Sequence, residues 1–513
     1  MLAISSLACG TGARAEDVTY CKQVAPILWN NCASCHRPGE IGPFSLLTYK
    51  DAKKRAGFIK DITHDRRMPP WKPEAGFGDF RNVRRLSDED LNTLAKWADA
   101  GAPEGDPKDL PAMPHFPEGW QLGKPDLVLT MPKTFTVYAS GRDIYRNFVL
   151  KIPIDTDRTV AATEFRPGNR RVVHHALFFL DAFGQARRRD GEDGQPGYST
   201  FGGIGVLPSG GLGGWAPGAT PQRLPEGTGM FLAKGSELVM QIHYHPDGKE
   251  ETDLSSVGIY FTPKPATTIV GGIAMRTRSL DIPPGDSKYT VHCETQPLPA
   301  DVTALGIFPH MHNLGKEMKV TAYPPSGGEV PMIWIHDWDF NWQGAYRYVK
   351  PVRLPKGTVV KVDAVYDNSS DNPKNPSEPP KRVHWGEQTT DEMCLCGMTV
   401  ITDTPADLKK VRAMNFAELG AILGGGQLPE LRNRRAASTP KIDAETRKKI
   451  LAKLPADGFP IPEVIAPLLA QFDTNHDGRL TAAEVEAMPE PARSRMVDAI
   501  QKKIEANEKA KDK

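Results

Sequence analysis

The chain has 513 residues, 39% of them hydrophobic and 25% charged, as in an ordinary globular protein, and this length predicts about three or four domains. Lys and Arg number 64 against 63 for Asp and Glu, so no excess of positive charge indicates a nucleic acid or an anionic membrane surface as partner. No apolar run of about 18 residues predicts a transmembrane segment. We therefore expect small molecules or other proteins as partners.

The first 15 residues predict a secretory signal peptide. A short apolar stretch is followed by small residues and by the cleavage pattern Ala13-Arg14-Ala15. Cys9, which follows Leu7 and Ala8, leaves a lipoprotein signal as the alternative. The sequence thus predicts a periplasmic or secreted protein.

The segment after the signal predicts a covalent haem. Cys32, Cys35 and His36 form C-x-x-C-H, in which both thiols become thioethers and the histidine binds iron. A disulfide or a zinc knuckle is the alternative, but zinc needs a second ligand pair nearby. Met68 is the predicted sixth ligand because two prolines stiffen the chain after it, and His64 is the competing candidate.

A helix predicted from the N-cap Ser87 to a stop at Gly101 completes this region. Together these features predict a small all-α cytochrome c domain over residues 16–106. A Pro-rich linker over residues 107–117 follows it.

The middle of the chain predicts β-sandwiches and two metal sites. Short runs rich in β-branched and aromatic residues alternate with Gly, Pro and Asn, as in antiparallel sandwiches. His310 and His312 lie two apart and therefore share one face of a strand. The adjacent pair His174 and His175 can converge only at a bulge, a twist or a strand end. Imidazoles suit copper in both oxidation states, and a thioether suits cuprous copper. The predicted copper ligands are His174, His175, His243, His310, His312 and Met393.

Residues from about 118 to 405 resemble the copper type II, ascorbate-dependent monooxygenases, the family of dopamine β-hydroxylase and peptidylglycine α-hydroxylating monooxygenase. The matching phrases are VVHHALFF, GWAPGATPQRLPEGTG, LVMQIHYH, DIPPGD, PHMHNLGK and DEMC, in the family's order. The resemblance implies two jelly-roll-like sandwiches, over 118–270 and 271–405, that face each other across a solvent-filled cleft. It also implies two copper centres with different roles. The electron-transfer copper would be held by His174, His175 and His243, and the catalytic, dioxygen-binding copper by His310, His312 and Met393.

The resemblance further implies hydroxylation of a substrate C–H bond by O2, with electrons from ascorbate. Because a haem motif precedes the copper motifs, we expect the haem held by His36 and Met68 to supply electrons to the first copper, since tethering raises its effective concentration. A separate redox partner protein is another possible donor. Phe308, Leu395 and Gly397 stand where peptide-amidating relatives bind a carboxylate, which indicates a neutral or aromatic substrate. The alternative function is a catalytically inactive, copper- and haem-binding electron-transfer protein.

The remaining cysteines and histidines have weaker assignments. Cys293 is expected to form a disulfide with Cys394 or Cys396, and sequence alone does not choose between them. His245, two residues after His243, is expected to lie behind the first copper or on the surface, and a role as an extra ligand is the alternative.

Residues 406–513 predict an α-helical tail with one EF-hand loop over 473–484. Gly478 makes the turn of this loop, and no second loop is visible in the sequence. The predicted calcium ligands are Asp473, Asn475, Asp477, Arg479, Thr481 and Glu484.

Overall fold

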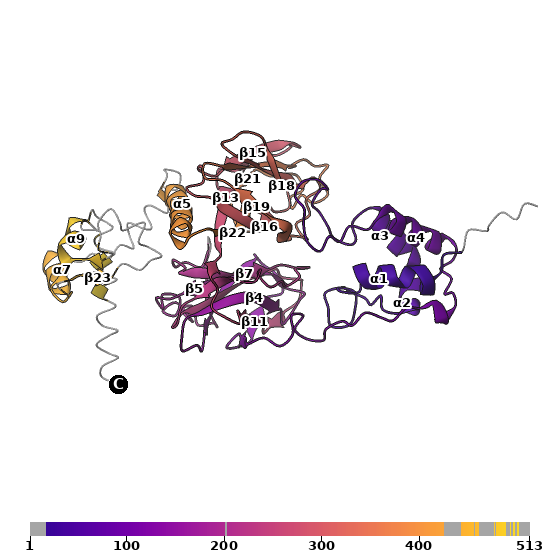
Figure 1. The fold of residues 1–513 in the computed structure, drawn as a ribbon, viewed down its shortest axis with the longest axis horizontal. Helices are drawn as coiled ribbons and strands as arrows, with labels where there is room; N and C mark the ends of the chain where they lie inside the picture. Colours follow the sequence, from indigo (N-terminus) through magenta and orange to yellow (C-terminus); the bar gives the residue numbers. More distant parts are fainter. Residues whose placement is uncertain are drawn as a thin grey trace, which may run out of the picture.

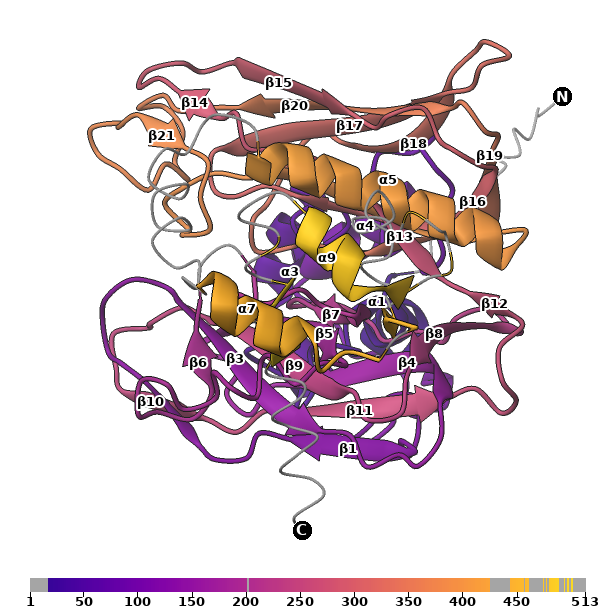
Figure 2. The same cartoon turned by 90° about the vertical axis from the view of Figure 1, so that its left-hand side faces the viewer.

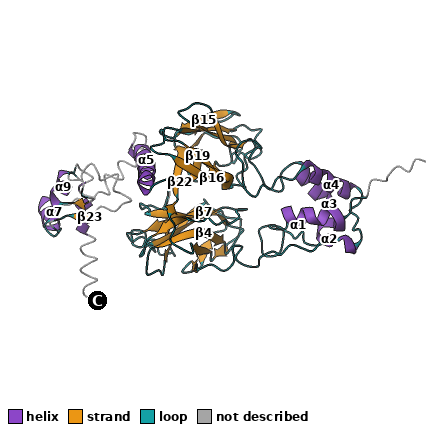
Figure 3. Cartoon of the chain, viewed as in Figure 1, coloured by secondary structure: helices purple, strands orange, loops and turns teal. Residues whose placement is uncertain are grey.

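The computed structural model describes residues 17–200, 203–424, 443–455, 457–460, 474, 477 and 479–488, with 493, 496, 497, 500 and 501. The chain is mostly β and about 16% helical. Four sheets of four or five strands carry most of the described middle region, and they form two bodies with one apolar core each (Figures 1 and 3).

The first β body contains two five-stranded sheets. Its core lies between them and includes Phe148, Phe178 and Leu238. The outer sheet has the order β1 (Leu127–Thr130), β11 (Ser256–Phe261), β4 (Arg158–Arg166), β8 (Thr228–Leu232) and β12 (Thr268–Ile269). The inner sheet has the order β6 (Tyr198–Ser199), β3 (Ile144–Lys151), β9 (Glu237–Tyr244), β5 (Val173–Asp181) and β7 (Gly210–Trp215). A short pair joins β2 (Phe135–Val137) to β10 (Glu251–Asp253).

The second β body contains two four-stranded sheets around a core that includes Met318, Ile333 and Val362. The inner sheet has the order β13 (Gly271–Thr277), β22 (Cys394–Thr402), β16 (Val302–His310) and β19 (Tyr346–Leu354). The outer sheet has the order β15 (Tyr289–Glu294), β20 (Val359–Tyr366), β17 (Gly315–Tyr323) and β18 (Val330–Ile335), and a short pair joins β14 (Asp281–Ile282) to β21 (Val383–His384). Figure 2 shows the two inner sheets lying between the two outer ones.

Alternating burial along the strands explains why each sheet covers a core. In β22, buried side chains alternate with more exposed ones, as a pleated strand with one face on the core requires. The thiol of Cys293 in β15 forms a hydrogen bond with the thiol of Cys394 at the start of β22, across the core. Both of these cysteines are free thiols in the structure. This contact favours Cys394 over Cys396 as the partner in the predicted disulfide.

The N-terminal helical segment precedes the β bodies (Figure 1). It packs Tyr20, Leu28 and Trp97 into a small core. The helix predicted after Ser87 is α4, and a capping box between Ser87 and Asp90 starts it. The elements are η1 (Tyr20–Val24), α1 (Ala25–Asn31), α2 (Tyr49–Lys53), α3 (Ala56–His64), α4 (Asp88–Asp99) and η2 (Pro107–Asp109).

Residues 69–85, which we call the strap, leave this segment and lie along the second β body. Glu74 N donates to Trp334 O over 2.8 Å, and Val349 N donates to Asp79 O over 2.8 Å. Pro73 forms a bridge with Ile335, next to the strap's contact with Trp334. Because β18 and β19 are edge strands of two different sheets, the strap covers backbone groups that would otherwise be unpaired.

The fold class predicted from the sequence is therefore wrong. The described chain is mostly β with four main sheets and few helices, and no small all-α cytochrome domain stands by itself, because the strap is irregular and lies along the second β body, with single bridges at Pro73 and Phe80. Prolines at 69, 70 and 73 keep the strap out of a helix. The sheets are not wholly antiparallel either, since β12 pairs with β8 in parallel.

The C-terminal region is also not purely helical. Helix α5 (Pro405–Gly424) contacts β13, and α7 (Ala444–Leu451) and α9 (Ala482–Ala487) lie further along the chain. Between them β23 (Phe459–Pro460) pairs with β24 (Arg479–Leu480). The predicted signal peptide and the predicted calcium ligands Asp473 and Asn475 lie outside the described residues. Among the described residues no helix is long and apolar enough to cross a membrane.

Candidate metal centres

Three histidines of the first β body, which we call the first cluster, converge at the same end of β5 and β9. His174 and His175 lie at the start of β5, and His175 is the register partner of His243 in β9. A register shift between Val173 and His175 gives the bulge that two adjacent histidines need in order to converge. One ring nitrogen from each of the three histidines lies within 4.8 Å of the other two.

In the first cluster the ring nitrogens that lie closest together are all Nδ1 atoms. Nδ1 of His175 lies 3.2 Å from Nδ1 of His174 and 3.4 Å from Nδ1 of His243. Burial lowers the pKa of His174 to about 3 and lowers the pKa values of His175 and His243 below the usual range. Neutral imidazoles keep a lone pair for a metal, so the residues present fit a copper ion bound by three Nδ1 atoms.

Asp143 and Tyr145 support the first cluster from β3 and the turn before it. Asp143 Oδ2 lies 3.2 Å from Nε2 of His243, and Asp143 Oδ1 lies 2.7 Å from Nδ1 of His245. The ring of Tyr145 stacks on that of His243 at 4.3 Å. Asp143 thus faces the outer nitrogen of His243 and leaves Nδ1 for the metal, as a carboxylate behind a metal ligand does.

The second cluster lies at the end of β16. His310 is the last residue of that strand, and the rings of His310 and His312 lie 5.2 Å apart and nearly perpendicular. Nδ1 of His310 contacts Oε1 of Gln343, and Nδ1 of His312 lies 3.0 Å from Asp391 O. These contacts leave Nε2 of each ring for a metal. Burial lowers the pKa of His310 to about 4 and that of His312 to about 3.

Met393 is brought to the second cluster through its neighbour Glu392. Oε2 of Glu392 accepts from the backbone N–H groups of His312 at 2.9 Å and of Met393 at 3.1 Å, and Oε1 accepts from Leu314 N at 2.6 Å. Burial raises the pKa of Glu392 to about 8. The hydroxyl of Tyr366 donates to Met393 O over 2.8 Å. The Met393 backbone is thereby held near His312, and its thioether as a copper ligand stays a prediction.

One aromatic ring lies between the two clusters. Phe340, from the loop between β18 and β19, stacks on His174 at 4.6 Å and meets His312 at 5.4 Å with its ring steeply inclined. The resemblance implied a solvent-filled cleft between the copper sites. Phe340 is a buried apolar ring that joins His174 to His312 at this point, and the cleft stays a prediction.

Further contacts hold the two bodies together beside the clusters. The hydroxyl of Tyr145 donates to Glu387 O, and Thr389 N donates to Asp143 Oδ2 over 2.9 Å. Sequence reasoning missed Asp143, Gln343 and Phe340, because each lies far along the chain from the histidine it contacts. Only Glu392 carried a local signal, since it directly precedes Met393.

The predicted haem ligands lie in the N-terminal helical segment. His36 Nδ1 lies 3.1 Å from Phe44 O, which leaves Nε2 for iron, and Cys32 and Cys35 are half-buried free thiols. His64 is 83% exposed, whereas Met68 is half-buried with its N–H bonded to Ile62 O. These residues fit a c-type haem, and the choice between Met68 and His64 as sixth ligand stays a prediction.

The described part of the predicted calcium loop is closed by Glu484. Its Oε1 accepts from Thr474 N over 2.8 Å, and its Oε2 accepts from Thr481 N over 2.9 Å. These bonds lower the pKa of Glu484 to about 2. Asp477 Oδ1 accepts from Arg479 N. The two ends of the loop are thus near each other, as a ring of ligands requires, although a cation would compete for both oxygens of Glu484.

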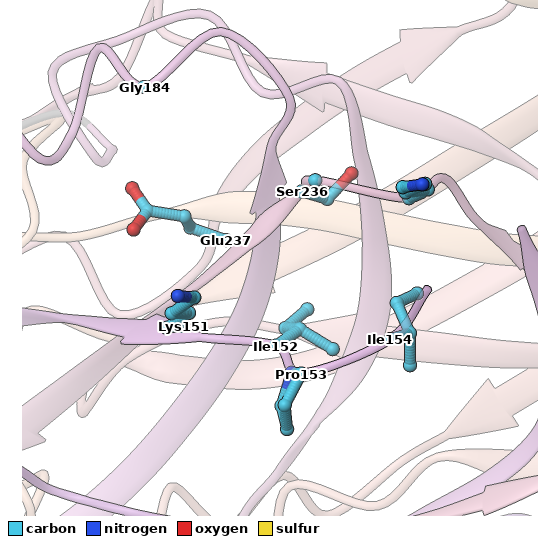
Figure 4. Close-up of a pocket in the computed structure, with 9 residues that line it drawn as sticks. Lys151, Ile152, Pro153, Ile154, Gly184, Ser236 and Glu237 are labelled. Atoms are coloured by element: carbon cyan, nitrogen blue, oxygen red, sulfur yellow. The ribbon is translucent and has the colours of Figure 1, made fainter. Parts of the chain in front are cut away.

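An open pocket of about 440 Å³ lies at the far end of β3 and β9 from the first cluster (Figure 4). Its lining includes Lys151 and Glu237, which are register partners. Glu237 already pairs with Arg187 over 2.7 Å. The pocket is therefore separate from the histidines.

Comparison with known proteins finds distant relatives. No family model matches the chain. The chain is 27% identical to MOXD1 homolog 1 of Drosophila melanogaster over 201 residues, which cover 36% of this chain and 27% of that protein. It is 28% identical over 188 residues to the peptidylglycine alpha-amidating monooxygenases of Rattus norvegicus and Mus musculus, covering 35% of this chain and 18% of each relative. The chain is a distant relative of monooxygenases.

The similarity to solved structures is too low to carry an argument. PNGF-II aligns with a TM-score of 0.24 and 10% identity over 54% of this chain and 66% of that chain. The VP2 subviral particle of infectious bursal disease virus aligns with a TM-score of 0.15 and 9% identity over 55% of this chain and 72% of that chain.

Proposed function

We propose that this chain is a copper-dependent monooxygenase that uses O2 to hydroxylate a C–H bond of a small organic substrate, in the periplasm or outside the cell. The observation that carries the proposal is the pair of neutral histidine clusters, one on each β body, on either side of Phe340. The similarity to monooxygenases supports it. The aligned regions span less than a third of the length of each relative. The activity and the substrate of this chain are therefore part of the proposal.

In this proposal the first copper is held by Nδ1 of His174, His175 and His243. The second is held by Nε2 of His310 and His312 with the thioether of Met393. Copper held by these residues would supply one-electron redox chemistry at both sites, and at the second site it would supply the chemistry that uses O2.

The remaining residues orient ligands and exclude water. Asp143 and Gln343 fix the rings of His243 and His310, and Glu392 fixes the backbone around His312. Phe340 and Tyr145 cover the histidine rings with apolar surface. A ligand set held in this way needs little rearrangement between oxidation states, which suits repeated electron transfer.

The electrons come from ascorbate, from a redox partner protein, or from a haem bound to Cys32 and Cys35 with His36 and Met68 as axial ligands. The free Nε2 of His36 and the shielded position of Met68 support the haem. Replacing Met68 by Ala should abolish the weak absorbance band that marks methionine bound to ferric haem, and replacing the exposed His64 should not. The reverse result would make His64 the ligand.

Calcium is a further part of the proposal. We assign it to the loop of Asp473 to Glu484, which Glu484 and Thr474 close in the described part. Isothermal titration with calcium of the full chain and of a Glu484→Gln variant tests this assignment.

A catalytically inactive electron-transfer protein is the second candidate. The observation that favours it is Phe340, because one apolar ring touches a histidine of each cluster where a substrate would approach both. Such a protein would bind copper and haem but consume no O2.

Copper per chain in reconstituted, haem-loaded protein tests the proposal first. Two coppers, falling to one when His310 and Met393 are both replaced by Ala, support the two assigned sites. Ascorbate-driven O2 uptake in the presence of neutral aromatic or aliphatic compounds then separates the enzyme from the electron carrier. A wild-type chain with fewer than two tightly bound coppers contradicts the proposal.

A further inference from the structure

Residues 336–345, which we call the junction loop, connect β18 to β19 and reach both histidine clusters. Gln343 contacts Nδ1 of His310, and Trp338 Nε1 donates to His312 O over 3.1 Å. Phe340 lies against His174 as well as His312. One short loop therefore touches both histidines of the second cluster and one histidine of the first.

The strap holds both ends of this loop. Before the loop, Glu74 N donates to Trp334 O. After the loop, Arg81 N donates to Arg347 O and Val349 N donates to Asp79 O, each over 2.8 Å. The junction loop starts at the end of β18 and finishes at the beginning of β19, and these strands belong to different sheets. The strap contacts both strands and so fixes the distance between the two ends of the loop.

Side chains of the strap also contact β19 and the junction loop. The ring of Trp71 packs edge-on against Tyr346 at 5.5 Å, and that of Phe80 stacks on Tyr348 at 5.1 Å. Nζ of Lys72 lies 2.7 Å from Oδ2 of Asp337 inside the loop, and the Lys72 side chain is only 10% exposed. Trp71 and Lys72 thus contact the loop and the residue directly after it.

The strap also joins the junction loop to the haem motif. Met68, the predicted sixth haem ligand, is followed by Pro69 and Pro70 and then by Trp71. Proline fixes the φ angle of each residue it occupies, so this connection is short and stiff. The N-terminal helical segment and the second cluster are therefore linked through a few residues of restricted backbone.

We propose that the strap is a positioning element of the second copper site, with Trp71 as its main positioning residue. This inference rests on the proposed function, because it concerns the copper held by His310 and His312. Among the contacts that the described residues make, none joins the strap directly to a copper ligand. The strap keeps the junction loop where Gln343 and Trp338 meet the two histidines, so the N-terminal segment completes a site that lies in the second β body.

Loss of the Trp71 ring should affect the two clusters unequally. The second cluster has contacts from Gln343, Trp338 and Phe340, whereas the first has only the ring of Phe340 from this loop. Loss of groups that orient metal ligands commonly weakens metal binding by about 10- to 100-fold. We expect a loss of that size at the second cluster and a change below about threefold at the first.

The test uses the full chain in two backgrounds that each keep one cluster. His174→Ala with His175→Ala keeps only the second, and His310→Ala with His312→Ala keeps only the first. Trp71→Ala is placed in both backgrounds, and copper affinity is measured by competition with a chromophoric chelator. The Cu(II) electron paramagnetic resonance spectrum reports the ligand geometry independently of activity.

Phe77→Ala is the matched control. Phe77 lies on the same strap, but it packs on Trp334 at 5.0 Å and under Nζ of Lys319, which belong to β18 and β17 of the outer sheet and not to β19. This variant should leave both affinities within about twofold of the parent. Trp71→Phe, which keeps an aromatic ring beside Tyr346, should recover most of the affinity and the parent spectrum.

Each outcome has a distinct meaning. Weaker copper and an altered spectrum at the second cluster alone, with recovery in Trp71→Phe, support the inference. Unchanged second-cluster copper in Trp71→Ala overturns it, and so does an equal loss in Phe77→Ala. An equal loss at both clusters also overturns it, because general unfolding predicts that result. If the second-cluster background binds no copper before Trp71 is changed, the proposed function itself fails.

Discussion

The two histidine clusters are built in different ways. The first takes all three ligands from neighbouring strands of one sheet, with His175 and His243 as register partners. The second takes His310 from the end of β16 and His312 from the loop after it, and is supported by Gln343 and Glu392 from other parts of the second body. The first cluster directs Nδ1 atoms to its centre, and the second leaves Nε2 atoms free.

This difference predicts different sensitivity to distant changes. Sheet hydrogen bonds fix the first cluster locally, because strand register determines which residues face each other. The second depends on loops whose positions are set by tertiary contacts, among them the strap. Changes far from the metal should therefore affect the second cluster more than the first.

Removal of a ligand should give the largest effect. His243→Ala and His310→Ala should each lower bound copper from two per chain to one, and each should abolish O2-dependent hydroxylation, because the proposed reaction uses one electron from each copper. Elemental analysis with electron paramagnetic resonance would identify which copper remains. If either variant lost both coppers, the two clusters would not be independent sites.

Phe340→Ala should have the next largest effect, because it removes the one ring that touches both clusters. Loss of a buried Phe side chain costs about 3–5 kcal/mol of unfolding free energy. Urea unfolding of the metal-free protein measures this cost. Phe308→Ala is the control, since Phe308 is half-buried and stacks on His310 alone at 6.2 Å. Equal losses of unfolding free energy in both variants would argue against a special role for the ring of Phe340.

Replacing the groups behind the ligands should affect one cluster at a time. Asp143→Ala should weaken copper at the first cluster and Gln343→Ala at the second, each by about 10- to 100-fold. Chelator competition in backgrounds that keep a single cluster measures both affinities. A Gln343 variant that weakened the first cluster as much as the second would contradict the separation of the two sites.

The smallest effect should come from His245→Ala. His245 is 60% exposed and pairs with Asp143 at 2.7 Å, behind His243. Exposed ion pairs contribute about 0.2–1 kcal/mol, which corresponds to less than about sixfold in copper affinity at the first cluster. The same chelator competition gives the value. A loss as large as that of Asp143→Ala would instead indicate that His245 binds the metal.

Sequence patterns predicted the first cluster better than the second. The adjacent pair His174 and His175 demanded an irregular strand, and the structure has a register shift there. For the second cluster the sequence indicated His310 and His312, but not Gln343 or Phe340. Those two residues lie some 30 positions away, and only the path of the junction loop brings them to the histidines.

The sequence by itself determined the ligand types, the C-x-x-C-H motif and the β-rich middle of the chain, because these depend on residue chemistry and short-range periodicity. Tertiary structure alone decided that the strap leaves the helices for the edges of β18 and β19, and that the ring of Phe340 touches a histidine of each cluster. The all-α cytochrome domain was predicted wrongly for the same reason. Irregular segments such as residues 69–85 take their partners from whichever sheet edge lies unpaired, and local sequence does not specify that edge.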